Sequence, residues 1–357
     1  MTKTDDIDKR YMRRAFALAA KGRGGTHPNP MVGCVLVRGG KVVGSGWHRR
    51  FGGPHAEPQA LKIAGPRARG ATAYVTLEPC CYFGKTPPCT EALIKAGVRR
   101  VVAAMTDPNP LVSGKGFAKL RRAGIAVTRG VLKEEALELN RVFVHWIKKK
   151  RPYVILKAGA SLDGRIETSA QESKWITSPE ARRVSRGMRG EVDAILAGVG
   201  TVLADDPRLT AGAGRHPLRV ILDSRLRASA DAKVFRGPGR ALVATAAPGG
   251  SAAHADCLRL PRAKKGGIDL RALLKELARR GVSSLLVEGG SAVHTSFLEA
   301  GLVDEVHLFL APCLIGGRKA RSFFEGTGFR RLRSALKLSK LAFRRAGPDL
   351  LVTGRIL

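Results

Sequence analysis

The chain has 357 residues, 44% of them hydrophobic, and a formal net charge of +34 from 63 Lys and Arg against 29 Asp and Glu. This length exceeds one ordinary hydrophobic core and indicates two domains. No run approaches the roughly 18 apolar residues of a membrane helix, and charged residues occupy the place of a signal peptide's apolar segment. We therefore expect a cytoplasmic protein with no membrane partner.

The positive charge favours a polyanionic partner, whether nucleic acid, an anionic membrane or a phosphorylated small molecule. A bias in overall composition would produce the same excess without any such partner. The basic residues are scattered, and aromatic residues make up only 5% of the chain, so side chains for stacking on bases are few. We expect no nucleic-acid partner, and the charge alone leaves the kind of anionic partner open.

Cysteine usage points to a metal or to catalysis. Three of the six cysteines, Cys80, Cys81 and Cys89, fall within ten positions, and two of them are adjacent. This spacing makes a poor disulfide framework for a chain of this size, so a metal site or a catalytic thiol in a reducing compartment is the better interpretation.

The first half of the chain alternates helical and strand patterns. A helix capped by Asp5 or Asp6 extends to about Lys21, and two strands flanking Arg38-Gly39-Gly40 predict a hairpin. The alternation that follows implies a sheet covered by helices on both faces. We expect a helix from His55, a strand over 71–77, a helix over 88–96, a strand over 99–105, a helix over 116–123, a strand over 125–130 and a helix through about Trp146.

A domain boundary is expected where the charge run HWIKKKRP, residues 145–152, ends in proline. This divides the chain into residues 1–148 and residues 149–357. The second half again alternates the two patterns. It predicts strands over 153–160, 194–199, 219–223, 241–246, 283–290 and 305–312, and helices over 270–281 and 291–301.

The stretch HAEPQAL places His55 two residues before Glu57, at the start of a predicted helix. Either residue alone would be a helix-capping or first-turn residue. Together with Cys80 and Cys89, however, His55 completes three zinc ligands and leaves the fourth tetrahedral position for water, as in a catalytic zinc site. Glu57 is then no ligand, and its carboxylate can move a proton between that water and the leaving nitrogen. Cys81 is an alternative to Cys80, and iron or cobalt an alternative to zinc.

The order H-A-E, then Pro79-Cys80 and a second cysteine, resembles the signature of zinc nucleoside deaminases. Eight residues separate Cys80 from Cys89, and this long loop, with THPNP at 26–30, resembles the bifunctional riboflavin-biosynthesis deaminase/reductases. That resemblance implies a cytidine-deaminase-like three-layer α/β/α domain. It further implies a pyrimidine contact at Asn29 and a phosphate contact at Lys85, whereas Tyr82 stands where the family usually has His.

In the second half, LKAGASLDGR, SKWITS, GTVLADDPRLT and LLVEGGSAVHTSFLEAGLVDE resemble the reductase half of the same family. The resemblance implies a dihydrofolate-reductase-like α/β domain that uses NADPH. GVGTV lacks the third glycine of a Rossmann fingerprint. Family positions imply catalytic roles for Lys157 and Asp205. They imply substrate contacts at Ser173, Arg189, Leu209 and Glu288, and NADPH contacts at Gly159, Trp175, Thr201, Asp205, Ser224, Gly290, Ser291, Ala292, Val293, His294, Thr295 and Ser296.

Two successive reactions follow from the resemblance. The zinc site would hydrolytically deaminate 2,5-diamino-6-ribosylamino-4(3H)-pyrimidinone 5′-phosphate at C2. NADPH would then reduce the ribosyl group to ribityl, giving 5-amino-6-ribitylamino-uracil 5′-phosphate. We expect one catalytic zinc per chain and a homo-oligomer. The family's arginine after DDPxLT is replaced by Ala211-Gly212, so Arg208 or Arg215 takes its place. The rival interpretations are a nucleic-acid deaminase with an RNA-binding second half and a structural zinc protein.

Overall fold

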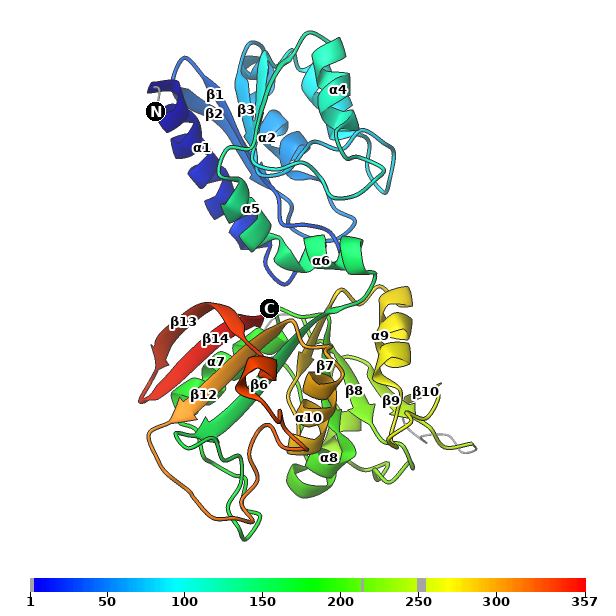
Figure 1. Ribbon diagram of the computed structural model, residues 1–357. Helices are drawn as coiled ribbons and strands as arrows, with labels where there is room; N and C mark the ends of the chain where they lie inside the picture. Colours follow the sequence, from blue (N-terminus) through cyan, green and yellow to red (C-terminus); the bar gives the residue numbers. More distant parts are fainter. Residues whose placement is uncertain (1–2, 213–214, 249–254) are drawn as a thin grey trace. The chain divides into compact units, whose positions relative to one another are not determined.

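The computed structural model describes residues 3–212, 215–248 and 255–357. The chain forms two compact units, Met1–Lys150 and Arg151–Leu357 (Figure 1). The boundary expected after residue 148 lies two residues before this division. Among the helices described, none has both the length and the hydropathy needed to cross a bilayer.

The first unit is built on a five-stranded sheet of order β2-β1-β3-β4-β5. The first two strands form the predicted hairpin, whose turn residues Gly39 and Gly40 both have positive φ angles, 55° and 73°. β1 runs antiparallel to β3, while β3, β4 and β5 are mutually parallel. The strands are β1 (Gly33–Arg38), β2 (Lys41–Trp47), β3 (Thr72–Val75), β4 (Arg100–Ala103) and β5 (Ala126–Arg129).

Helices of the first unit begin and end close to the predicted positions, with two differences. The first helix starts at Lys3, so Asp5 and Asp6 lie in its first turn and do not cap it. The last predicted helix is broken at Asn140, whose side chain pairs with the main chain of Met31. The helices are α1 (Lys3–Ala19), η1 (Ala20–Gly22), α2 (Ala56–Ala64), η2 (Gly65–Ala68), α3 (Cys89–Lys95), α4 (Lys115–Arg122), α5 (Lys133–Leu139) and α6 (Arg141–Lys149).

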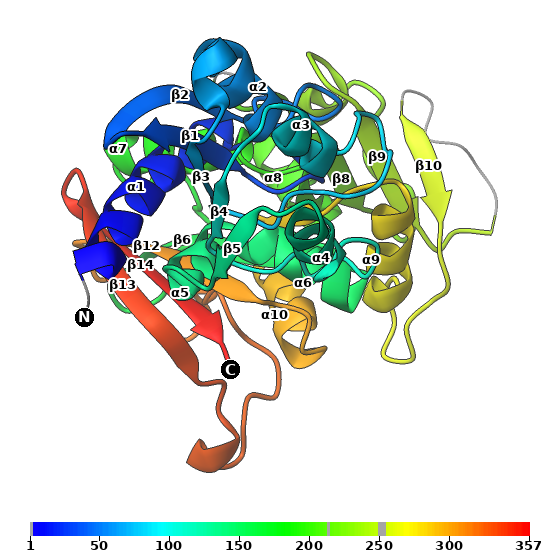
Figure 2. The same ribbon diagram turned by 90° about the horizontal axis from the view of Figure 1, so that it is seen from above.

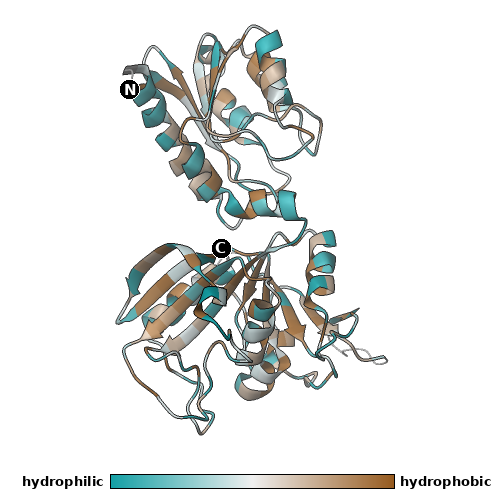
Figure 3. Ribbon diagram, viewed as in Figure 1, coloured by the Kyte–Doolittle hydropathy of each residue, from teal (hydrophilic) through white to brown (hydrophobic). Residues whose placement is uncertain are grey.

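Alternate residues of β1 face different helices, which makes the unit a three-layer structure. Cys34 and Leu36 pack into a buried cluster with α2, α3 and α4. Val35 and Val37 pack on the opposite face with α1, α5 and α6. The period of two along the strand therefore produces a sheet that is covered on both faces. Figure 3 shows the hydrophobic residues gathered on the strands and on the inner faces of the helices.

Glycines of β2 allow α2 to pack directly on the sheet. A Cβ atom at Gly46 would lie 2.5 Å from the carbonyl oxygen of Ala56, and one at Gly44 would lie 2.3 Å from that of Ala60. Such distances are far inside van der Waals contact, so a side chain at either position would push α2 away from the sheet. The close approach matters because the first turn of α2 carries Glu57 and its N-cap residue is His55.

The second unit is built on a nine-stranded sheet of order β10-β9-β8-β7-β11-β6-β12-β14-β13. Its strands are parallel from β10 to β12, and the carboxyl-terminal hairpin of β13 and β14 is antiparallel. Figure 2 shows β10 and β13 at opposite edges. The strands are β6 (Tyr153–Ser161), β7 (Ala194–Gly198), β8 (Leu218–Leu222), β9 (Ala241–Thr245), β10 (Asp256–Arg259), β11 (Ser284–Val287), β12 (Glu305–Ala311), β13 (Leu338–Ala346) and β14 (Asp349–Ile356).

Helices cover both faces of this larger sheet as well. The main buried cluster joins α9 and α10 to one face, while α7 and α8 pack in smaller clusters with the other. The predicted strands and the helices α9 and α10 are present, whereas α7, α8, β10 and the β13–β14 hairpin were not predicted. The helical segments are α7 (Pro179–Arg189), α8 (Val199–Asp205), η3 (Lys233–Phe235), α9 (Leu270–Arg279), α10 (Ser291–Glu299) and η4 (Leu332–Ser334).

Candidate active sites

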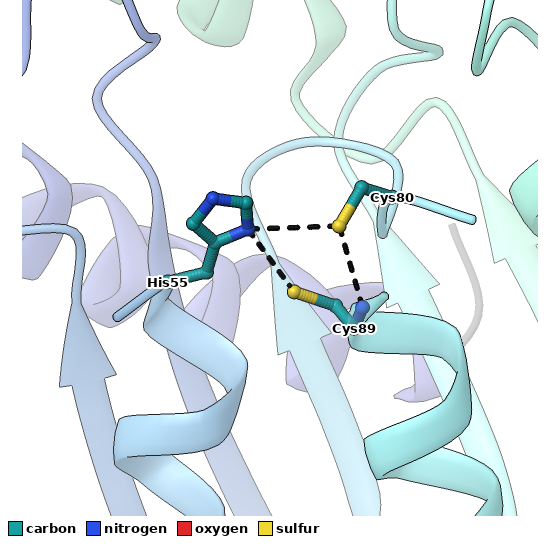
Figure 4. Close-up of side chains that lie close together, drawn as sticks. All are labelled: His55, Cys80 and Cys89. Carbon is teal, nitrogen blue, oxygen red and sulfur yellow. Dashed lines mark hydrogen bonds between the residues drawn. The ribbon is translucent and has the colours of Figure 1, made fainter. Parts of the chain in front are cut away.

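Three predicted ligands of the first unit converge on one point (Figure 4). The Nδ1 atom of His55 lies 3.3 Å from the Sγ atom of Cys89 and 3.6 Å from that of Cys80. In a tetrahedral zinc site, with Zn–S near 2.3 Å and Zn–N near 2.0–2.1 Å, nitrogen and sulfur ligands lie about 3.6 Å apart. The two nitrogen–sulfur distances therefore fit one zinc ion, and all three ligand atoms lie within 4.8 Å of one another.

The surrounding hydrogen bonds favour the ligand forms of these side chains. The Nε2 atom of His55 lies 3.3 Å from the hydroxyl of Thr86, which leaves Nδ1 for the metal. The main-chain N–H of Cys89 donates to the Cys80 sulfur at 3.3 Å. Hydrogen bonding from the Cys89 thiol, then from His55, lowers the pKa of Cys80 despite its burial, so this sulfur is the readier thiolate. Cys81 lies outside the cluster, and its sulfur faces the Leu111 carbonyl oxygen.

Glu57 is buried beside the cluster and does not belong to it. Only 3% of the residue is exposed, and its Oε2 atom has no hydrogen-bond partner among the described residues. Burial first, and then the charge of Cys80, raise the pKa of this carboxyl group. A buried oxygen without a partner next to three metal ligands is the arrangement expected of a group that bonds a water or a substrate.

A cavity of about 370 Å³ opens beside this cluster and is lined by His55, Cys80 and Glu57. Asn29, Tyr82 and Lys85, all singled out from the sequence, line it. The cation of Lys85 lies 4.1 Å from the ring centroid of Phe51, which steadies it at the cavity wall.

His48, which the sequence did not single out, orients Asn29. Its Nδ1 atom lies 3.1 Å from the Pro54 carbonyl oxygen, which can only accept, so Nδ1 carries the hydrogen. The Nε2 atom of His48 is therefore an acceptor, and it lies 3.2 Å from the side-chain nitrogen of Asn29. The oxygen of the Asn29 amide is thus left as an acceptor for a ligand. His48 immediately follows β2, which was the available signal.

Asp107 and Asn109 also line the cavity and were missed. They follow β4, the parallel neighbour of β3, and the loop after β3 carries Cys80. Carboxyl ends of adjacent parallel strands lie at the same edge of a sheet, and this rule could have found both residues. Burial, then the nearby charge of Glu78, raise the pKa of Asp107 to about 7 despite a hydrogen bond from the Asn109 amide.

In the second unit, Lys157, Arg189 and Glu288 form one buried charge cluster. The Lys157 ammonium lies 3.1 Å from Glu288, and Arg189 holds the same carboxylate through two bonds of 2.8 Å. Parallel pairing of β6 with β11 brings Lys157 and Glu288 together, since the residues before them, Leu156 and Val287, are register partners. Burial opposes the charge on Glu288, but Lys157 and Arg189 lower its pKa to about 2. Two cations against one carboxylate leave a net positive site.

Asp205 makes no hydrogen bond or ion pair with that cluster among the described residues. It ends α8, accepts a 3.1 Å hydrogen bond from Ser173 and lies 3.8 Å from the Lys174 ammonium. The two residues predicted to act together, Lys157 and Asp205, therefore each have a different ionic partner.

The predicted phosphate-binding turn is formed. Gly290 has a φ of 69° and is the N-cap of α10, and the main-chain N–H groups of Ser291 and Ala292 precede the first intrahelical hydrogen bond, so they can face an anion. Thr201 lies against this turn, because a Cβ atom at Gly290 would lie 3.3 Å from its hydroxyl. Gly159 packs closely as well, since a Cβ atom at this position would lie 3.1 Å from the Thr177 methyl group.

The remaining predicted contacts differ in accessibility. The side chains of Leu209, Ser291 and His294 are buried, which leaves mainly their backbone for a ligand. Trp175 is 69% exposed, with the Arg182 guanidinium 4.4 Å from its ring centroid. Arg215 pairs with Asp193 at 3.0 Å, while Arg208 is exposed. Ala292 and Ser296 are exposed, and Ser224, Val293 and Thr295 are half-buried.

Comparison with known proteins accounts for both sites. The family described as the cytidine and deoxycytidylate deaminase zinc-binding region matches residues 5–105, and the RibD C-terminal domain matches residues 152–352. The chain belongs to the RibD family. It is 44% identical to the riboflavin biosynthesis protein RibD of Aquifex aeolicus, over 97% of this chain and 98% of that protein. RibD of Acinetobacter baumannii superposes with a TM-score of 0.91 at 38% identity, covering 99% of each chain.

The activities follow from this membership. A structure from Thermotoga maritima that is named as a diaminohydroxyphosphoribosylaminopyrimidine deaminase and 5-amino-6-(5-phosphoribosylamino)uracil reductase is 37% identical. It covers 99% of this chain and 100% of its own, with a TM-score of 0.89. The chain is a bifunctional RibD enzyme of riboflavin biosynthesis, with a zinc-binding deaminase unit and a reductase unit that uses NADPH. The predicted family, fold class, function and cofactors are confirmed.

The charge cluster of the reductase unit predicts a dependence of stability on pH. The Glu288 pKa is about 2 in the folded chain, below its ordinary value of 4.5, so the unfolded chain binds this proton first as pH falls. The cluster stabilises the fold fully above about pH 5, and up to about 3 kcal/mol is lost as pH falls towards 2. Hydrogen exchange of β6 and β11 amides should record the loss.

Glu288→Gln is the matched variant for this measurement. The variant should lower the protection of the β6 and β11 amides near pH 5. Below that pH the protection should fall less steeply than in the unmodified chain, because the titrating carboxylate is gone. Equal pH slopes in both chains would show that Glu288 does not carry the effect.

Proposed function

We propose that His55, Cys80 and Cys89 hold the zinc ion of the deaminase and that Glu57 moves the proton. The observation that carries this proposal is the convergence of the three ligand atoms, all within 4.8 Å of one another, beside the buried and unpartnered Oε2 of Glu57. Zinc bound there would act as a Lewis acid and lower the pKa of a water in its fourth position. Glu57 would accept a proton from that water as the water oxygen bonds C2, and would pass the proton to the amino nitrogen whose bond to C2 breaks, so that ammonia leaves.

The cavity over the zinc ligands recognises the pyrimidine and its phosphate. The side-chain oxygen of Asn29 is free to accept from a ring N–H, since its nitrogen is engaged by His48. Asp107 and Asn109 offer further polar groups to the amino substituents of the ring. Lys85 supplies a cation for the 5′-phosphate, with the Tyr82 hydroxyl as a donor beside it.

The deaminase assignment is tested by Glu57→Gln. The amide keeps the size of the side chain but cannot accept the proton, so ammonia release should fall by about 10²–10⁴-fold, the range of general acid–base catalysis. Zinc content, measured by metal analysis, should stay at one per chain because residue 57 is not a ligand.

Oxidation of NADPH on the deaminated intermediate is the internal control for that variant. It should be unchanged, because Glu57 lies in the other unit. Persistence of ammonia release at the rate of the unmodified enzyme would remove Glu57 from the mechanism.

In the reductase unit we propose that Lys157 donates a hydrogen bond to the reacting end of the ribose. Its ammonium is fixed by Glu288, and Arg189 keeps that carboxylate ionised, so a second donor remains for the substrate. Asp205, held by Ser173 and Lys174, is the candidate for the proton step at the opened sugar. NADPH supplies the hydride. The α10 turn from Gly290 to Ser296, with Thr201, would bind its diphosphate, and Gly159, Trp175 and Ser224 would line the rest of its site.

Lys157→Met tests this role. Methionine retains the stem but not the donor, and Glu288 stays paired with Arg189, so the unit should fold. NADPH oxidation at saturating substrate should fall by about 10²-fold or more, while ammonia release is unchanged. Lys265→Met is the matched control, since Lys265 is an exposed lysine that pairs with Glu299 on the surface. If Lys157→Met oxidised NADPH as fast as that control, Lys157 would have no part in hydride transfer.

We also propose that the enzyme is a cytoplasmic homo-oligomer without a nucleic-acid partner. All six cysteines are unpaired, as expected in a reducing compartment. The edge strand β13 exposes 57% of Leu341 and 73% of Phe343, and an edge of this kind is normally covered.

Sedimentation velocity of Phe343→Glu should then give a smaller species than the unmodified chain. A monomer in both samples would exclude β13 as an interface, and salt-sensitive binding of RNA would contradict the absence of a nucleic-acid partner.

A further inference from the structure

Glu78 is a buried carboxylate that neither binds the metal cluster nor forms an ion pair among the described residues. Only 3% of it is exposed. Its Oε2 atom accepts from the main-chain N–H groups of Asp107 at 3.2 Å and Gly114 at 2.9 Å, and its Oε1 atom accepts from that of Phe117 at 3.1 Å. Both oxygens are therefore occupied by protein donors, although the residue also lines the deaminase cavity.

These three donors belong to one segment, the loop after β4 and the first turn of α4. Gly114 is the N-cap of α4 and offers no side chain, so Glu78 supplies the acceptor from a distant part of the sequence. The negative charge also suits the positive end of the helix dipole. Because one of the three amides is that of Asp107, the same carboxylate holds the start of the loop as well as the helix.

The loop forms one wall of the deaminase cavity. Asp107, Asn109 and Val112 all line it. Within the loop, the Asp107 carboxylate accepts from the Asn109 N–H at 2.8 Å, and the Asn109 side chain accepts from the Leu111 N–H at 3.1 Å. The loop is thus braced by hydrogen bonds of its own, and Glu78 bonds it at both ends, through Asp107 and Gly114.

A second, independent feature brings α4 against the segment that carries Glu78. A Cβ atom at Gly116 would lie 2.2 Å from the Pro79 carbonyl oxygen and 3.1 Å from Oε1 of Glu78. Only glycine permits this approach. Pro79 precedes the ligand Cys80, so one short segment contacts the zinc site on one side and the loop and helix on the other.

The geometry points to Glu78 as a positioning residue for substrate recognition in the deaminase: it fixes the loop that carries Asp107 and Asn109 at a set distance from the zinc ligands. The inference rests on the proposed placement of the pyrimidine in this cavity. Glu78 acts through these two side chains, so its effect should appear in substrate binding more than in the chemical step.

Glu78→Gln is the direct test. An amide has one oxygen, so at least one of the three N–H groups would face the NH₂ group and lose its acceptor. The KM for the pyrimidine phosphate in ammonia release should rise by about 10-fold, equivalent to about 1.4 kcal/mol, with kcat changed less than about threefold. Zinc content and NADPH oxidation should be unchanged. Gly116→Ala, which displaces α4 from the other side of the same contact, should raise KM in the same direction.

A double-mutant cycle separates positioning from a general loss of structure. In a chain that already carries Asp107→Ala and Asn109→Ala, adding Glu78→Gln should change KM by less than about threefold, because the side chains it positions are gone. Glu91→Gln is the matched control, since Glu91 pairs with Lys119 of α4 on the surface and does not touch the loop. Its KM should equal that of the unmodified enzyme.

Two results would overturn the inference. Either the same 10-fold rise in both backgrounds, or a loss of zinc or kcat in place of a rise in KM, would make Glu78 a general structural residue. The proposed binding of the pyrimidine in this cavity is tested separately. It would be contradicted if Asp107→Ala and Asn109→Ala left KM unchanged in a chain that still releases ammonia.

Discussion

The deaminase depends on one constraint: the start of α2, the loop after β3 and the start of α3 must meet at the same end of a five-stranded sheet. His55, Cys80 and Cys89 come from these three segments, and their ligand atoms lie within 4.8 Å of one another. Cys89 opens α3 and its main-chain N–H donates to the Cys80 sulfur, and helix N-terminal amides favour the thiolate form in which the proposed ligands would bind zinc. The side-chain-free contact of β2 with α2 keeps the imidazole at this distance.

The corresponding constraint in the reductase unit is the Glu288 carboxylate, which needs nearby cations. A buried carboxylate is unfavourable alone, and Glu288 is ionised only because Lys157 and Arg189 both contact it. The cluster joins β6, β11 and α7, so the position of the Lys157 ammonium is determined by elements far apart in the sequence. A cationic site of this kind suits phosphorylated and carbonyl-bearing substrates, and it uses only a few of the positive charges on the chain.

Local patterns predicted most of this architecture, for identifiable reasons. Strands such as β1, β6, β7 and β11 have nearly continuous apolar runs, and the HAE and PC motifs contain proposed metal ligands within short segments. The misses are of another kind. Asp107, Asn109 and His48 follow strands without any motif, and only their neighbours in the sheet reveal them. The break at Asn140 also escaped prediction, because it depends on a hydrogen-bonded pairing with Met31, 109 residues away.

The pairing of Asn140 with Met31 links the end of the first unit to a segment near its start. Asn140 fastens the junction of α5 and α6 beside the segment that carries Asn29, and α6 contributes Phe143, Trp146 and Ile147 to the cavity. The last helix before the reductase unit, α6, therefore also forms part of the wall of the deaminase cavity. During synthesis, the deaminase cavity stays incomplete until nearly all of the first 150 residues have left the ribosome. The three proposed metal ligands, in contrast, lie within the first 89 residues.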